Sequence, residues 1–95
     1  GRYRDLARRI QAPVAVVLQV PVQPLLGGLT EDDLVAATFA RYLDGGGPDW
    51  PLLLPMAKAG SAALTALAAV ATSDCGVTPD RFLVTGTSKR GWATW

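Results

Sequence analysis

The residues with the clearest chemical potential form one short run near the end of the sequence, Gly86-Thr87-Ser88-Lys89-Arg90-Gly91. An apolar stretch typical of a strand precedes this run, and a helical pattern follows it. A serine on a sharp turn between a strand and a helix is the arrangement of a nucleophile elbow, which exposes the hydroxyl for attack on a carbonyl carbon. Ser88 is therefore predicted to be a catalytic nucleophile.

The neighbours of this serine have predicted roles in the same elbow. Gly86 leaves space for the tight backbone crossing, and Gly91 lets the helix pack closely on the sheet. The backbone N–H of Lys89 is predicted to point at the oxyanion that develops during attack, where the helix dipole is also favourable. The strict pattern G-x-S-x-G is not met, because Arg90 stands at the second glycine position. The looser pattern is a weak signal by itself, and its place after an apolar strand raises its value.

Lys89 and Arg90 put two cations into the first turn of a helix, where the helix dipole disfavours positive charge by roughly 0.3–1 kcal/mol each. Such local conflicts are frequent at working sites. Either side chain could bind an anionic substrate group or pair with a buried acid, or the two could form an ordinary solvent-facing or salt-bridged pair. Gln19 and Gln23 are possible lining residues, or simply polar loop residues. Lys89 is disfavoured as a base for its neighbour, because adjacent helical residues do not face each other.

The composition excludes several functions. The 95 residues contain no histidine, so a Ser–His–acid mechanism cannot be completed within them, and the segment alone is predicted to be inactive. Cys75 is the only cysteine, which excludes an internal disulfide or a cysteine metal site. A net charge of +1 gives no field directed at nucleic acid or an anionic membrane. A phosphate-binding loop fails because Trp92 and Ala93 follow Gly91. No cofactor and no metal are predicted.

Two apolar stretches are predicted to be the strands that position this elbow. Val14–Val20 is almost continuously apolar and rich in β-branched residues, which is typical of a strand buried on both faces of a parallel sheet. Arg81–Thr85 is a shorter strand that leads directly into the elbow. Helical patterns separate the two strands, so the predicted fold is α/β, a parallel sheet with helical crossovers.

Three helices are predicted before the elbow, over Asp5–Gln11, residues 30–43 and Pro51–Ala71. Thr30 is the predicted N-cap of the second helix, and three acidic residues follow it at the positive end of the helix dipole. The third helix approaches the length of a membrane span, but Pro55, Lys58 and its alanine-rich composition favour a core helix. No membrane span is therefore predicted.

The sequence is also predicted to be a partial domain, residues 1–95, truncated at both ends. It opens without an initiating methionine, and 49% of its residues are hydrophobic, which is high for so short a chain. Two buried strands need sheet neighbours, so we expect the segment to require the rest of its own domain and not to fold stably alone.

Four runs resemble one protein family. The run V-T-G-T-S-K-R-G-W-A-T-W resembles the signature of the PhoPQ-activated pathogenicity-related proteins, a branch of the α/β-hydrolase superfamily. The runs A-P-V-A-V-V-L-Q-V-P-V-Q-P-L, L-T-E-D-D-L-V-A-A-T-F-A-R-Y-L and D-W-P-L-L-L-P-M-A-K-A are similar to earlier parts of the same family. The resemblance spans about Leu6 to Trp95. One departure is Val22, where the family usually shows a polar residue, so no polar contact is expected there.

The resemblance implies an α/β-hydrolase fold in which Ser88 matches the family's nucleophile and the acid and histidine lie beyond Trp95. It also implies an exported protein, periplasmic or extracellular, linked to virulence. The expected activity is hydrolysis of an ester or peptide bond in a small-molecule or peptide substrate. The alternative is a non-catalytic secreted binding or signalling protein on a hydrolase scaffold, in which Lys89 and Arg90 bind an anionic ligand.

Overall fold

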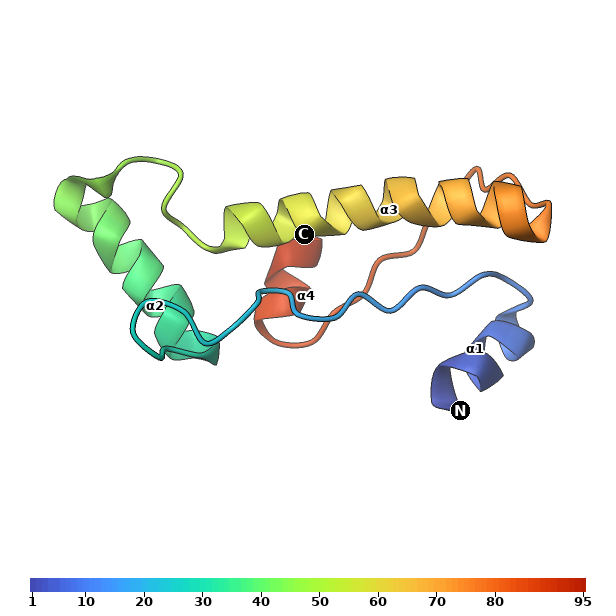
Figure 1. Cartoon of the computed structure of the whole chain (residues 1–95), viewed down its shortest axis with the longest axis horizontal. Helices are drawn as coiled ribbons and strands as arrows, with labels where there is room; N and C mark the ends of the chain where they lie inside the picture. The colour runs from blue at the N-terminus through green and yellow to red at the C-terminus, as the bar shows by residue number, and fades with distance from the viewer.

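The computed structural model describes residues 1–95, which form helices joined by extended and looped segments (Figure 1). The helices in chain order are α1 (Arg2–Ile10), α2 (Glu31–Arg41), the π-helical turn η1 (Tyr42–Gly46), α3 (Leu53–Cys75) and α4 (Lys89–Thr94). In Figure 1 the long helix α3 crosses the molecule, with α4 beside its N-terminal half and α2 at its N-terminal end.

The predicted α/β fold with a parallel sheet is wrong for these residues, because the structure contains helices and no strand. Val14–Val20 and Arg81–Thr85 lie in extended or irregular backbone, and their N–H groups donate no backbone hydrogen bond. A strand has no internal hydrogen bonds and exists only when a neighbour completes its ladder. The apolar patterns indicate segments suited to burial, but Leu18 and Leu83 remain 77% and 93% exposed.

The α3 helix forms where alanine and leucine, both strong helix formers, are concentrated. One face of the helix lies toward the rest of the molecule: Met56 is buried, and Leu53, Leu64 and Leu67 are partly buried. The helix runs beyond the predicted end and stops at Gly76, whose left-handed backbone (φ 66°) lets Val77 donate back to the Ala71 carbonyl. The sequence predicted a helix here correctly, but it predicted the end of the helix a few residues too early.

A small core sits where α2, the start of α3 and α4 meet. Leu34, Val35, Leu52 and Met56 are buried there, and Ala93 of α4 packs against them. The buried Thr38 hydroxyl donates to the Val35 carbonyl over 2.7 Å and accepts from the Leu52 N–H over 3.0 Å. These two bonds join α2 to the chain that enters α3, and so fix the surface on which α4 lies.

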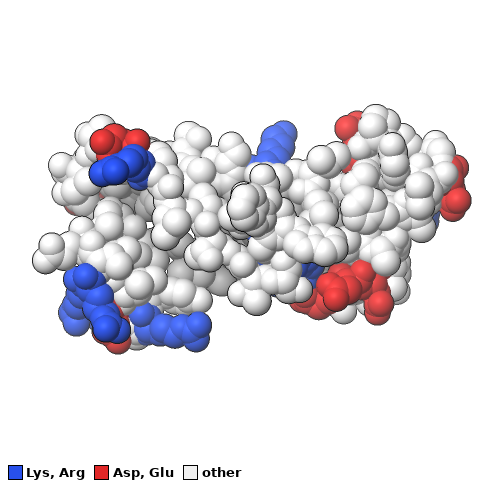
Figure 2. Space-filling model, turned by 180° about the vertical axis from the view of Figure 1, so that it is seen from behind, with Lys and Arg blue, Asp and Glu red and all other residues white.

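The molecule is elongated, with extents of 49 × 25 × 20 Å and a radius of gyration of 16.0 Å. A compact domain of this length has a radius of about 12 Å. Only 7 of the 95 residues are buried, so the core is small. Figure 2 shows charged side chains near the two ends of the molecule and a broad, mostly uncharged surface between them.

The α3 helix is long and apolar enough to cross a membrane by length and composition, and 6% of its most apolar 18-residue window is buried. A single helix of this kind is weak evidence, because core helices have the same composition. The predicted core helix is therefore left largely uncovered by the rest of these 95 residues. The absence of a membrane span stays a prediction.

Candidate functional site

Ser88 occupies an unusual backbone conformation between the extended segment and α4. Its φ is 58° and its ψ is −128°, a combination that side chains with a Cβ rarely adopt. Its side chain is exposed. Strained residues of this kind are concentrated at active sites, where the surrounding structure holds them in place. The backbone therefore presents a solvent-facing hydroxyl on a sharp turn, although the residues before the turn form no strand.

Gly86 and Gly91 lie backbone to backbone across this turn. A Cβ added to Gly86 would come within 2.7 Å of the Arg90 carbonyl, and one added to Gly91 would come within 2.9 Å of the Gly86 oxygen. Neither approach leaves room for a side chain, because the opposing atoms belong to the main chain. The elbow thus needs glycine at both positions, with the second glycine one place later than in the strict pattern.

The amides after Ser88 differ in their hydrogen bonds. The Arg90 N–H donates to the Thr87 carbonyl over 3.1 Å, and the Trp92 N–H donates to the Ser88 carbonyl over 3.2 Å. The Lys89 N–H donates to no protein acceptor. A free amide directly after an exposed serine hydroxyl can interact with negative charge that develops beside that hydroxyl.

The Lys89 side chain is buried and is not a free cation. Its ammonium forms an ion pair with the Glu31 carboxylate, and the lysine side chain is only 2% exposed. Burial, followed by the positive charge of Arg90, lowers the pKa of Lys89. The structure shows no hydrogen bond between this lysine and the Ser88 hydroxyl, and the sequence also disfavoured Lys89 as a base for Ser88.

Arg90 lies at the edge of the same cluster and keeps more solvent contact. Its guanidinium is 3.7 Å from the second Glu31 oxygen, and its side chain is 40% exposed. One carboxylate therefore faces two cations, which leaves one net positive charge beside the elbow. The structure shows both cations in ion pairs with Glu31, whose side chain is 54% exposed, so this acid is not the buried one considered from the sequence. Binding of an anionic substrate group stays a prediction.

Gln23 joins the cluster through Glu31. Its Nε2 donates to the Glu31 carboxylate over 2.6 Å, and its Oε1 accepts from the Glu31 N–H over 2.8 Å. Thr30 is the N-cap residue of α2, as predicted, but its side chain makes no cap hydrogen bond. Gln23 supplies the first acceptor for α2 instead, from seven residues before that threonine.

Gln19 lies apart from the hydrogen bonds of this cluster. It lines an open, mainly apolar groove of about 340 Å³ together with Val20, Pro21, Met56 and other residues of the loop and α3. The structure therefore brings Gln23, Lys89 and Arg90 together around Glu31 and leaves Gln19 out. No three His, Cys, Asp or Glu side chains lie together in a metal-binding arrangement.

Sequence reasoning missed Glu31, the residue that connects the cluster. An acidic residue at a helix start is explained well enough by the helix dipole, so the pattern gave no reason to seek a partner. The available signal was the pair of cations in the first turn of the later helix, which required an acid from elsewhere in the chain.

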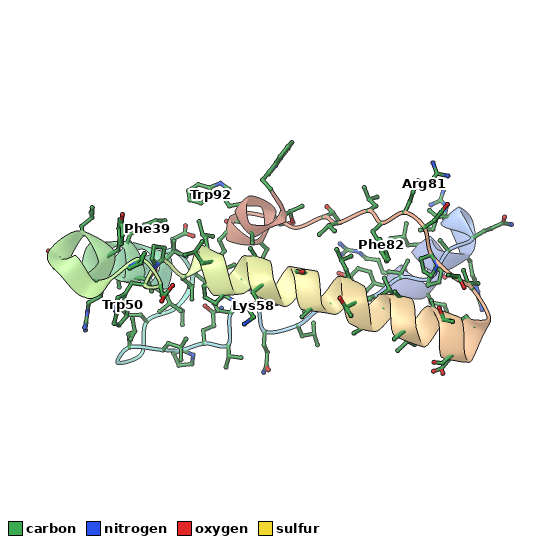
Figure 3. The ribbon with its side chains drawn as sticks, turned by 90° about the horizontal axis from the view of Figure 1, so that it is seen from above. Phe39, Trp50, Lys58, Arg81, Phe82 and Trp92 are labelled. Atoms are coloured by element: carbon green, nitrogen blue, oxygen red, sulfur yellow. The ribbon has the colours of Figure 1, made fainter.

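Figure 3 shows Trp92 beside the N-terminal half of α3, with Arg81 and Phe82 near the opposite end of that helix.

Comparisons with known proteins identify relatives of this chain. The model of the PhoPQ-activated pathogenicity-related protein family matches residues 1–95. The chain is also 37% identical over 83 residues to the Autocrine proliferation repressor protein A of Dictyostelium discoideum, and the match covers 81% of this chain. It spans 17% of the length of that relative. No solved structure matches the chain.

Proposed function

The chain belongs to the PhoPQ-activated pathogenicity-related protein family, and we propose that it carries the nucleophile of a serine hydrolase that cleaves an ester or peptide bond. The single observation that carries this proposal is the backbone of Ser88, held at φ 58° and ψ −128° with its side chain exposed. A strained serine costs of order 1–3 kcal/mol, and such strain is typical of active sites. The elbow glycines and the free Lys89 amide support the same role.

The proposed reaction begins when the Ser88 hydroxyl attacks the carbonyl carbon of the substrate. The hydroxyl proton passes to a base outside these residues, since the 95 residues hold no histidine. The carbonyl oxygen becomes an oxyanion that the Lys89 N–H can stabilise. The leaving group departs with the proton, and water then hydrolyses the acyl-serine ester to release the acid and restore the hydroxyl.

Arg90 is the proposed contact for an anionic group on the substrate. Its guanidinium is half-exposed and only loosely paired at 3.7 Å from Glu31, so donors remain available beside Ser88. A carboxylate or another anion a short distance from the scissile bond would match this charge. The proposed substrates are therefore esters or peptides that carry negative charge.

A fluorophosphonate probe tests the nucleophile assignment on the full-length protein. The probe should label the wild type and should fail to label Ser88→Ala. Ser61→Ala is the matched control, because Ser61 is an exposed serine on α3 with no part in the elbow. Equal labelling of Ser88→Ala and the wild type would show that another residue is the nucleophile.

A second candidate function is a signalling protein that binds its partner without catalysis. The name of the Dictyostelium relative, an autocrine proliferation repressor, favours this candidate. The discriminating measurement is the biological effect of the full-length Ser88→Ala variant. Under the hydrolase proposal the variant loses its effect, whereas a purely binding protein keeps it.

A further inference from the structure

We propose that Glu31 is a positioning residue for the elbow, acting through the buried side chain of Lys89. This inference rests on the proposed function, in which Ser88 is the nucleophile and the Lys89 amide faces the oxyanion. The two residues of this ion pair lie far apart in the sequence, because Glu31 begins α2 and Lys89 begins α4. Glu31 would touch neither the substrate nor the reacting atoms.

The ion pair explains how a charged side chain is held inside the molecule. The Lys89 side chain is 2% exposed, whereas that of Glu31 is 54% exposed. A buried ammonium without a partner is strongly unfavourable, so this lysine stays in place only while a carboxylate faces it. Because Lys89 directly follows Ser88, its anchored side chain also fixes the backbone on the C-terminal side of the nucleophile.

Glu31 is itself held from two directions, which makes it suited to positioning. Gln23 contacts both its carboxylate and its backbone N–H, at 2.6 and 2.8 Å. Arg90 approaches the carboxylate from the elbow side at 3.7 Å. The Glu31 backbone has a positive φ of 50°, an uncommon value for a glutamate. The carboxylate is thus held in place, and it pairs with the two cations in the first turn of α4.

Loss of the carboxylate should disturb the elbow first. In Glu31→Gln the oxygen that faces Gln23 is kept, but the negative charge opposite the buried ammonium is removed. The lysine side chain must then move toward water and pull the first turn of α4 with it. A misplaced Lys89 amide would stabilise the oxyanion poorly, which slows the chemical step more than it weakens substrate binding.

Hydrogen exchange and labelling kinetics of the full-length protein test this inference. In Glu31→Gln we expect faster amide exchange confined to residues 84–95, and a maximum fluorophosphonate labelling rate reduced roughly ten- to hundredfold. The probe concentration for half-maximal rate should stay unchanged. Asp33→Asn is the matched control, since Asp33 is an exposed acid in the same helical turn without an ion pair, and it should behave as the wild type.

A double variant separates positioning from simple loss of stability. Glu31→Gln combined with Lys89→Met leaves no buried charge without a partner, so exchange of residues 84–95 should return toward the wild-type rate. If Glu31→Gln does not fold, Glu31→Asp keeps the charge on a shorter side chain and should loosen the same residues. Unchanged exchange of residues 84–95 in the folded variant, or an equal increase along the whole chain, would overturn the inference.

The outcome also distinguishes this inference from the proposed function. A wild type that is not labelled at Ser88 would contradict the hydrolase, while the exchange of residues 84–95 would still decide whether Glu31 positions the elbow. A wild type that is labelled, with a Glu31→Gln variant labelled equally fast, would leave the hydrolase standing and contradict the role of Glu31.

Discussion

At the scale of single residues, the backbone of Ser88 can be tested separately from its chemistry. Ser88→Gly and Ser88→Ala both remove the hydroxyl, but only glycine adopts φ 58° and ψ −128° without strain. Relief of about 1–3 kcal/mol of strain should exceed the roughly 0.4–1 kcal/mol that glycine loses through greater freedom of the unfolded chain. We therefore expect Ser88→Gly to be more stable than Ser88→Ala.

Chemical denaturation of the two full-length variants measures this difference. Serine and alanine share the Cβ that causes the strain, so Ser88→Ala is the control for loss of the hydroxyl. An alanine variant as stable as the glycine variant would show that the elbow is relaxed. The strained serine would then no longer support an active site.

Residue spacing predicted the sharp turn at Ser88, because the turn depends on neighbouring residues, but the strand predicted before it is absent and its catalytic role stays a prediction. Gly86, Ser88 and Gly91 lie within six positions of one another, and their close approach follows from the turn between them. Glu31 could not be predicted in the same way. Its partner lies far along the chain, and the two meet because α2 and α4 both pack at the start of α3.

At the scale of elements, the start of α2 offers a second test. Gln23 accepts the Glu31 N–H, whereas the Thr30 side chain makes no cap hydrogen bond. Gln23→Ala should therefore destabilise the protein by about 1 kcal/mol, as loss of a helix cap commonly does. Thr30→Ala should have a smaller effect, and thermal unfolding of both full-length variants compares them. A larger loss in Thr30→Ala would mean that the Thr30 hydroxyl, and not Gln23, supplies the cap hydrogen bond.

The same scale explains why helices could be predicted from the sequence and the sheet could not. The helix α3 makes its hydrogen bonds within its own residues, so its alanine-rich composition was sufficient to predict it. A strand depends on a neighbour that the sequence of the strand does not specify. Val14–Val20 has the composition of a buried strand, yet no second segment pairs with it here.

At the scale of the whole molecule, many large apolar side chains are exposed to solvent. The chain is elongated and buries 7 of its 95 residues. It also spans 17% of the length of its Dictyostelium relative. These facts agree with the expectation that residues 1–95 do not fold stably alone, which stays a prediction. The site described here is accordingly one part of the proposed machinery, with the base and the acid to be sought elsewhere in the full-length protein.

The most direct test of the central claim is to trap the acyl-enzyme on Ser88. The full-length protein would be mixed with an activated ester, quenched in acid and digested with trypsin, which cleaves after Arg81 and Lys89. Mass spectrometry should find the acyl group on the Phe82–Lys89 peptide of the wild type and nowhere in Ser88→Ala. An acyl group on another peptide, with this one unmodified, would contradict the assignment of Ser88 as the nucleophile.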